Sequence, residues 1–328
     1  MLNSITKKWT KSNKPRDSTD ASPISTLTDL EYSESSSEFE ILSCKSSIHD
    51  DAYNLDNGKK LLLIFNQTKF PNHDTCPNDR EGVEQDTQAI RNTFNPLGFF
   101  IEAYENSSVA EIKHKLLSLS KMDGLSCLII FISTHGYEND VLLAFDKDFN
   151  LRCDIIEELS PEKMSSLAGK PKVIFVQACQ GSKKDKGILI KYRKSNIHEV
   201  DGHGSGVPIH KMSTHVDFLL VKSSYHGYFS FRSNTSGSWF IQTVCKEIGK
   251  SSPTDDLLSI MPRVIRNISL NYTSCHEDPD IDQCKQTPML EATLQRKIYL
   301  KSNSIVESSE DNLNSDEYPL TECKCILS

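Results

Sequence analysis

Between residues 60 and 300, hydrophobic positions alternate between short continuous runs and a helical spacing. Continuous apolar runs are typical of strands that are buried on both faces, as in a parallel sheet. Apolar residues three and four positions apart indicate helices that cover such a sheet. Because the two patterns alternate along the chain, we expect an α/β domain with mostly parallel strands. The expected strands are residues 61–65, 99–104, 128–132, 173–176, 218–221 and 298–300.

Four helices are expected from the same spacing. Ser108 followed by Glu111 is a capping box, so a helix should begin there. Gly98 directly after Leu97 is a typical helix end. The expected helices are residues 83–97, 108–117, 238–248 and 255–268.

Three segments lack either pattern. Residues 1–56 are rich in serine and poor in aliphatic residues, so we expect a disordered leader. A charged, glycine-rich stretch that begins at about residue 182 reads as a long linker inside the domain. Residues 301–328 carry six Asp and Glu against two Lys and form an acidic tail.

Composition narrows the possible functions. The chain has 328 residues and a mass of 37.0 kDa, enough for one large α/β domain or two small ones. A net charge of −8 argues against a dedicated nucleic-acid binder. We find no apolar run long enough to span a bilayer and no secretory signal. The ten cysteines include no CxxC pair, and the histidines fit no ligand spacing, so we expect reduced thiols in the cytoplasm and neither a metal nor a cofactor.

Two of the expected strands end in residues that could react together. One strand is followed by Ser133-Thr-His135-Gly136, and another by Gln177-Ala-Cys179-Gln-Gly181. The carboxyl ends of parallel strands meet at one edge of a sheet, where active sites form. There, His135 could deprotonate the Cys179 thiol, and the backbone N–H groups of Gly136 and Cys179 could bind an oxyanion.

Each of these residues alone would mean little. A lone cysteine after a strand is usually an inert core residue, and a lone histidine beside glycine is usually part of a loop. The combination is more specific, because Gln-Ala-Cys-Gln-Gly with a histidine about 50 residues upstream is a local caspase signature.

From Lys60 to Leu300 the chain resembles the catalytic domain of the caspases, the aspartate-specific cysteine proteases. Besides the two segments above, three motifs carry the resemblance: Arg80-Glu-Gly-Val-Glu-Gln-Asp86, Ser166-Leu-Ala-Gly-Lys-Pro-Lys172 and Gly237-Ser-Trp-Phe-Ile-Gln242. The resemblance implies a three-layer α/β fold with a central, mostly parallel six-stranded sheet flanked by helices. It also implies a Cys179–His135 dyad and a short-leader, executioner-like family member.

The resemblance implies the substrate-binding residues as well. The S1 pocket, which binds the side chain of the substrate residue (P1) on the N-terminal side of the cleaved bond, would be lined by Arg80, Gln177 and Arg232. Two guanidiniums and an amide suit one aspartate carboxylate through charge-assisted hydrogen bonds. Ser230, Phe231 and Arg232 would pair with extended substrate as a β-strand. Tyr228, Phe231 and Trp239 would shape the S2 and S4 subsites, although Trp239 could equally be a core residue.

The chain departs from the usual family pattern at four positions. Phe231 replaces the usual Trp, Val83 replaces Thr, Thr134 replaces Ser, and Gln180 replaces Arg. None of these changes removes a reacting group. The first two lie beside the expected substrate subsites and bear on subsite preference.

The resemblance further implies activation by proteolysis. His198-Glu-Val-Asp201 precedes Gly202 in the linker, so we expect cleavage of a zymogen after Asp201. This divides residues 57–201, the large subunit, from residues 202–300, the small subunit. Asp20 and Asp56 are weaker candidates for cleavage in the leader.

Partners follow from the same resemblance. We expect protein substrates with P1 Asp, a homodimer of large and small subunit pairs, an upstream initiator protease, inhibitor proteins and a role in apoptosis. Two alternatives stay open: a catalytically silent scaffold that dimerises with an active caspase, and a related basic-specific peptidase. The two expected S1 arginines argue against the second alternative.

The end of the sequence carries an independent signal. Cys325-Ile-Leu-Ser328 matches a C-a-a-X prenylation motif, and Cys323 could accept a second lipid. A single prenyl chain binds membranes only marginally, so we expect a membrane fraction only if Cys325 is modified.

Overall fold

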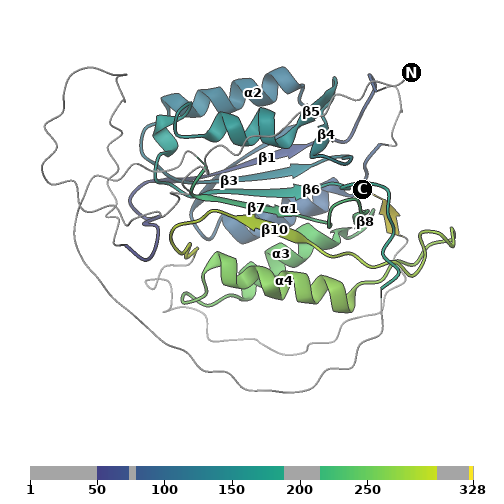
Figure 1. Cartoon of the computed structure of the whole chain (residues 1–328). Coiled ribbons are helices and arrows are strands. Elements are labelled where there is room, and N and C mark those ends of the chain that lie inside the picture. The colour runs from purple at the N-terminus through teal and green to yellow at the C-terminus, as the bar shows by residue number, and fades with distance from the viewer. Residues whose placement is uncertain (1–49, 74–78, 188–214, 301–324, 328) are drawn as a thin grey trace, which may run out of the picture. The chain divides into compact units, whose positions relative to one another are not determined.

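The structure, a computed structural model, describes residues 50–73, 79–187, 215–300 and 325–327. Its centre is a six-stranded sheet with the strand order β10-β7-β6-β3-β1-β2 (Figure 1). Neighbouring strands are parallel except for β10, which is antiparallel to β7. This confirms the expected three-layer, mostly parallel α/β fold. The strands are β1 Lys59–Asn66, β2 Phe99–Glu105, β3 Leu125–Ser133, β6 Lys172–Gln177, β7 Phe218–Lys222 and β10 Met289–Ala292.

Helices cover both faces of this sheet. One face packs against α1 Val83–Phe94, α3 Trp239–Lys250 and α4 Leu257–Asn271 (Figure 1). The other face packs against α2 Val109–Ser118 and a group of short helical turns. These turns are η1 Leu119–Lys121, η2 Leu151–Ile156, η3 Glu157–Leu159 and η4 Ser165–Leu167.

Two smaller sheets lie beside the main one. The first is the hairpin of β4 Val141–Leu143 and β5 Asp148–Asn150. The second has the strand order β11-β8-β9 and is antiparallel. Its strands are β8 Phe231–Ser233, β9 Gly237–Ser238 and β11 Cys325–Leu327.

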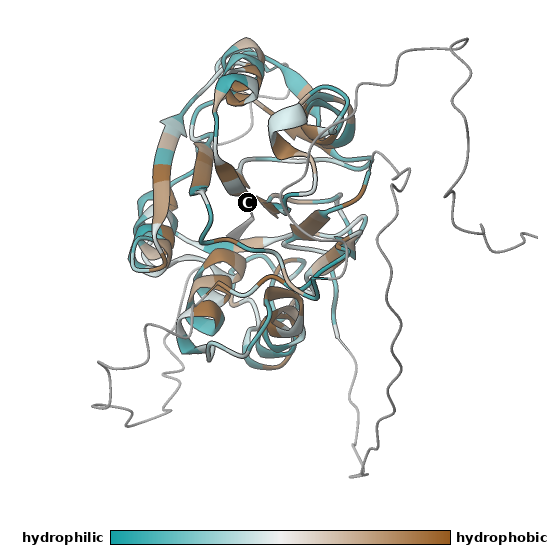
Figure 2. Cartoon of the chain, turned by 90° about the vertical axis from the view of Figure 1, so that its left-hand side faces the viewer, coloured by the Kyte–Doolittle hydropathy of each residue, from teal (hydrophilic) through white to brown (hydrophobic). Residues whose placement is uncertain are grey.

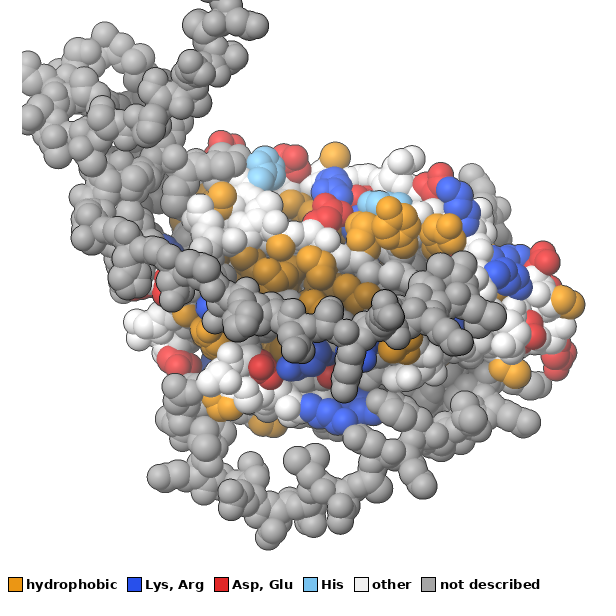
Figure 3. All heavy atoms as spheres, turned by 60° about the horizontal axis from the view of Figure 1, so that its bottom comes forward, with side chains coloured by type: hydrophobic (Ala, Val, Ile, Leu, Met, Phe, Trp, Pro, Cys, Tyr) orange, Lys and Arg blue, Asp and Glu red, His pale blue; other side chains and the backbone are white. Residues whose placement is uncertain are grey.

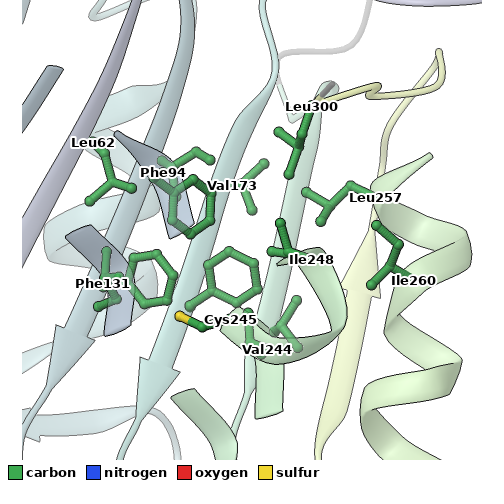
Figure 4. Packing of buried hydrophobic residues seen from close by; sticks show 14 of the residues in the cluster. Leu62, Phe94, Phe131, Val173, Val244, Cys245, Ile248, Leu257, Ile260 and Leu300 are labelled. Carbon is green, nitrogen blue, oxygen red and sulfur yellow. The ribbon is translucent and has the colours of Figure 1, made fainter. Parts of the chain in front are cut away.

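The continuous apolar runs become fully buried strands because both faces of the sheet are covered. Every residue of β3, β6 and β7 is buried. On the α3 and α4 side, aromatic residues of helix and strand interlock: the Phe94 and Phe131 rings lie 5.8 Å apart (Figure 4). Burial of this much apolar surface is the main stabilising contribution to such a domain. In Figure 2, hydrophobic segments accordingly lie on the strands and on the facing sides of the helices.

Three of the α-helices begin at side-chain caps, one of which the sequence predicted. Ser108 Oγ accepts a hydrogen bond from the Glu111 N–H at 3.2 Å, and Glu111 Oε2 accepts one from the Ser108 N–H at 2.7 Å. The predicted capping box is therefore confirmed. The side chains of Ser238 and Asp256 cap α3 and α4 by accepting hydrogen bonds from backbone N–H groups of the first turn, which would otherwise be unpaired.

The expected strand at residues 298–300 is wrong. Ile298 and Leu300 are buried in the cluster around α3 and α4. Beside them, Lys297 and Tyr299 form only isolated bridges, to Ala52 and Asp256, so residues 298–300 are not a strand. The last strand of the sheet is instead β10, whose residues are only partly buried and form no apolar run. An apolar pattern reports burial, and here burial does not coincide with strand pairing.

The packed region begins earlier than the boundary expected at residue 57. Tyr53 and Leu55 are each 5% exposed and belong to the main core cluster. Tyr53 donates a hydrogen bond to Asp217 Oδ1 at 2.7 Å, and burial raises the pKa of its phenol. The start of the expected linker is also held to the rest of the domain by two isolated β-bridges. Lys183 forms one with Tyr228, and Asp185 forms the other with Lys285. The leader up to residue 49 and the linker from 188 to 214 lie outside the described residues.

On the side that lies at the bottom of Figure 1, acidic and basic side chains are interspersed with hydrophobic ones (Figure 3). Within the described ranges, no helix is both long and apolar enough to cross a membrane. The described residues also contain no group of three or more acidic, Cys or His side chains arranged to hold a metal ion.

Candidate active site

The register between β3 and β6 places the two reactive segments side by side. Ser133 is paired with Gln177, the last residue of each strand, and the Thr134 N–H donates to the Gln177 carbonyl at 3.0 Å. His135 and Cys179 each follow two residues after this pair. The structure thus brings both segments to the carboxyl edge of the sheet, where the sequence predicted them.

Gly136 lies directly against the backbone of Cys179. A Cβ atom at Gly136 would be 2.6 Å from the Cys179 carbonyl oxygen and 3.0 Å from Ala178 Cβ. No side chain fits there, so glycine allows the backbone after His135 to approach the cysteine. The His135 ring lies 4.8 Å from the ring of Phe70, which holds one side of the imidazole.

Cys179 is 7% exposed and faces the segment that leads into β8. Its Sγ accepts a hydrogen bond from the Ser230 N–H at 3.4 Å and lies 3.9 Å from the Ser230 carbonyl oxygen. Gln177 donates through Nε2 to Ser230 Oγ at 2.9 Å. Ser230 therefore joins the cysteine, the predicted S1 glutamine and β8 in one contact network.

Arg80 and Arg232 are buried but do not have all their hydrogen bonds. Arg80 donates through Nη1 to the Gln67 carbonyl at 3.2 Å and to Ser133 Oγ at 3.0 Å. Arg80 Nε and Nη2, and Arg232 Nε and Nη1, have no hydrogen-bond partner among the described residues. Buried polar groups are nearly always paired, so these four atoms call for an explanation.

The electrostatics of the two arginines are linked. Burial lowers the pKa of Arg80, and the charge of Arg232 lowers it further. Burial likewise lowers the pKa of Arg232. Asp86 and Cys179 act in the opposite direction on both guanidiniums. Two cations that share one buried region therefore lie close enough to the cysteine for their charges to interact.

Asp86 holds the elements that carry these arginines. It accepts hydrogen bonds from the Ser238 N–H at 2.9 Å and from Gln242 Nε2 at 2.8 Å, which joins α1 to β9 and α3. Burial raises the pKa of Asp86 to about 6, against the effect of these hydrogen bonds. The sequence placed Asp86 in a motif but gave it no role; its spacing six residues after Arg80 was the available signal.

Two glycines with positive φ make this junction possible. A Cβ at Gly82, where φ is +76°, would lie 2.7 Å from the Ser233 carbonyl oxygen. A Cβ at Gly237, where φ is +84°, would lie 2.4 Å from Asp86 Oδ1. Glycine at both positions therefore lets the Arg80 segment and α1 approach β8 and β9 closely.

A second buried amide, Gln286, positions β8. Its Oε1 accepts the Phe231 N–H at 2.7 Å, and its Nε2 donates to the Ser223 carbonyl at 2.8 Å. The side chain thus connects β8 to the end of β7. Sequence reasoning missed Gln286, because it belongs to none of the recognised motifs.

The aromatic residues near β8 divide into two groups. Phe231 stacks on Trp239 at 4.9 Å, and Phe229 packs against this pair. Tyr228 is not part of that cluster. It lines a separate pocket of about 180 Å³ together with Asp185, Tyr225, Lys285, Gln286 and Thr287. Phe229, which the sequence did not single out, is the aromatic residue that packs beside Phe231 and Trp239, and the subsite role of Tyr228 stays a prediction. Trp239 is 5% exposed, as a core residue would be.

Several predicted positions remain untested. Asp201, Asp20 and Cys323 lie outside the described residues. Asp56 is exposed just before β1, and its carboxylate accepts a hydrogen bond from Lys60 Nζ at 3.4 Å. For Cys325 only the backbone position in β11 is described.

Comparison with known protein families and sequences shows which family this chain belongs to. Residues 59–299 match the family model Peptidase_C14, the caspase domain. Caspase-1 of Drosophila melanogaster is 33% identical over 251 residues, which cover 74% of each chain. Caspase-1 of Spodoptera frugiperda is 30% identical over 249 residues, covering 74% of this chain and 79% of the relative.

The structure agrees with the sequence comparison. A crystal structure of caspase-1 from Spodoptera frugiperda superimposes with a TM-score of 0.69 at 27% identity and covers 80% of this chain and 98% of the other. The fold is that of a caspase-like cysteine peptidase. The chain belongs to the caspase family.

Proposed function

We propose that this protein is a cysteine endopeptidase that cleaves after aspartate, with Cys179 as nucleophile and His135 as the proton-transferring base. Family membership supports the peptidase activity. The location of both segments at one sheet edge supports the assignment of the dyad.

In this mechanism His135 takes the proton from the Cys179 thiol, and the thiolate attacks the scissile carbonyl carbon. The backbone N–H groups of Gly136 and Cys179 stabilise the negative oxygen of the tetrahedral intermediate. His135 then protonates the leaving amine as the C–N bond breaks. Water, deprotonated by His135, hydrolyses the thioester and restores the thiol.

One observation carries the choice of aspartate. Arg80 and Arg232 are 2% and 1% exposed, yet four of their N–H-bearing nitrogens have no partner among the described residues. A small carboxylate is the ligand that best pairs with two such guanidiniums. A substrate without this carboxylate leaves both cations unpaired, so it is rejected more strongly than a matching substrate is bound. Gln177 adds an amide beside the Ser230 hydroxyl.

β8 supports an extended binding mode for the substrate. It begins at the residue after Ser230, whose backbone contacts Cys179, and it carries Arg232. A peptide paired with this strand would place its P1 residue between the cysteine and the two arginines. Phe231 and its aromatic neighbours would then contact the P2 and P4 side chains.

The remaining parts of the proposal rest on family resemblance. We propose a zymogen that is cut after Asp201 by an upstream initiator protease, and a dimer of the resulting subunit pairs. We also propose inhibition by other proteins, a cytoplasmic location and an executioner role in apoptosis. Attachment of lipid to Cys325, with Cys323 as a second site, is an independent proposal.

The test is a panel of fluorogenic peptides that differ only at P1, which is Asp, Glu, Lys or Leu. We expect the processed protein to cleave the Asp peptide at least 100-fold faster than the Lys and Leu peptides, and Cys179→Ala to abolish cleavage. Cleavage of the Lys peptide would support the basic-specific alternative. A lack of cleavage of every peptide would support the silent scaffold.

A further inference from the structure

The chain's own C-terminal segment lies on the strand that we propose pairs with substrate. β11, Cys325–Leu327, is antiparallel to β8, with Ile326 opposite Arg232 and Leu327 opposite Phe231. In this three-stranded sheet β9 occupies the other side of β8. Since a strand has only two hydrogen-bonding edges, an extended peptide can pair with β8 only where β11 now lies.

The direction of the segment matches that of a substrate. From Cys325 to Leu327 the chain runs from Ser233 toward Phe231, the residue after Ser230. The Ser230 N–H contacts Cys179 Sγ at 3.4 Å. The acyl portion of a peptide substrate must also run with its C-terminal end toward the nucleophile. β11 thus imitates the polarity of a bound substrate and not merely its location.

The register identifies the residue pair that holds the two strands together. The Phe231 N–H donates to Gln286 Oε1 at 2.7 Å and is therefore not directed across to β11. In an antiparallel ladder, residues that bond to a given neighbour alternate along the strand. The cross-strand hydrogen bonds between β8 and β11 therefore fall on Arg232 and Ile326.

Connection and charge also favour this occupant. Residues 301–324 join β11 to Leu300 in the same chain, and a covalent connection of such length typically raises the effective concentration of a weak ligand to the order of millimolar. The connecting residues include six acidic side chains against two lysines. The net negative charge of this connecting segment complements the positive charge of the buried Arg80 and Arg232.

We infer that Cys325–Leu327 is an intramolecular competitor for the substrate-pairing edge of β8. The inference rests on the proposed function, because competition requires that peptides bind along β8. The protein then regulates its own site: peptide substrates bind only when the C-terminal segment leaves. Anything that captures or removes this segment would increase apparent substrate affinity without altering the reacting groups.

Two proline variants separate pairing from other effects of the tail. Ile326→Pro removes the N–H that bonds to Arg232. Leu327→Pro removes an N–H on the edge that faces away from β8, where proline is tolerated in a strand. Neither position lies in the proposed catalytic machinery. In the processed enzyme, we expect Ile326→Pro to lower the KM of an Asp peptide three- to tenfold with kcat changed less than twofold. For Leu327→Pro we expect values within twofold of the unaltered enzyme.

Amide hydrogen exchange tests the pairing without catalysis. In full-length Cys179→Ala protein, the Arg232 amide should exchange at least tenfold faster when Ile326→Pro is added, but not when Leu327→Pro is added. Equal exchange and equal KM in all variants would overturn the inference while leaving the proposed function intact. Protection that disappears on 100-fold dilution would assign the strand to a second copy and would also overturn it. Ile326-dependent protection in a chain that cleaves no peptide would support the pairing and count against the peptidase.

Discussion

Two groups of cations lie near the carboxyl edge of the sheet, each with at least one buried member, and they are built differently. Lys222, at the end of β7, forms ion pairs with Asp140 and with Glu291, the latter at 3.4 Å. Arg152 forms ion pairs with the same two carboxylates: its Nε lies 2.7 Å from Asp140 Oδ2, and its Nη2 lies 2.9 Å from Glu291 Oε2. All four charges are paired, and the cations lower the pKa of both carboxyl groups although burial acts against this.

Arg80 and Arg232 present the opposite case. The charge of one carboxylate, Asp86, favours the charged form of both arginines and acts against the lowering of their pKa. Asp86 itself accepts hydrogen bonds from Ser238 and Gln242. A buried charge without a full set of partners destabilises the folded state. The difference agrees with a structural role for the Lys222 network and supports our proposal that the arginine pair binds the carboxylate of a substrate.

The largest expected effect comes from removing one of these arginines. Arg80→Leu should lower kcat/KM for an Asp peptide at least 1000-fold, about 4 kcal/mol in transition-state free energy. It should change the free energy of unfolding by less than about 1 kcal/mol, because replacing an incompletely paired buried ion by an apolar side chain is often neutral. Peptidase assays and urea unfolding of the same preparation measure both. A loss of stability as large as the loss of activity would mean that Arg80 is structural.

Lys222→Met should give the opposite result. It leaves Asp140 buried with only Arg152 as a cationic partner, so we expect the free energy of unfolding to fall by roughly 3 kcal/mol. Below the unfolding transition, KM for the Asp peptide should stay within about twofold, because the ion network does not contact the arginine pair in any described interaction. A KM increase of tenfold at unchanged stability would place Lys222 in substrate binding.

The pH dependence of the free energy of unfolding tests the environment of Asp86. Its pKa is raised to about 6, so the native state binds this proton more tightly than the unfolded chain, whose Asp pKa is about 3.9. The contribution of Asp86 to stability therefore falls as pH rises from about 4 to 6, by roughly 2 to 3 kcal/mol. Asp86→Asn should remove this decrease, as measured by urea unfolding from pH 4 to 7.

Asp140 provides the matched control for this experiment. The pKa of Asp140 is lowered in the folded state. Its contribution to stability is therefore complete above the pKa of Asp in the unfolded chain, about 3.9, and is lost only as pH falls below that value through the lower folded pKa. Asp140→Asn should therefore shift the whole curve between pH 4 and 7 without altering its slope. Identical slopes for wild type and Asp86→Asn would contradict the assigned pKa.

The smallest expected effect lies at the exposed end of the ion network. The side chain of Arg152 is 47% exposed, so its ion pairs with Asp140 and Glu291 are partly screened by water. Arg152→Ala should lower the free energy of unfolding by less than about 1 kcal/mol. Added salt should shrink this difference further. A loss as large as that of Lys222→Met would show that the two cations contribute equally.

The sequence alone determined the parts of the molecule whose physics is local. Apolar runs marked β1, β3, β6 and β7, because a strand covered on both faces tolerates few polar residues. Ser108 and Glu111 marked the start of α2, because both capping partners lie within one helical turn. The motifs around His135 and Cys179 identified the family and predicted the reactive segments.

Only the tertiary structure decided which distant residues share an environment. β10 has no apolar run and became the last strand through pairing with β7, while Ile298 and Leu300 filled the core without pairing in the sheet. Gln286 and Asp86 acquired their roles from neighbours far away in sequence. The pairing of β11 with β8 likewise depends on a contact between residues almost one hundred positions apart. Local patterns report burial and caps, but such long-range pairings depend on how the elements pack together.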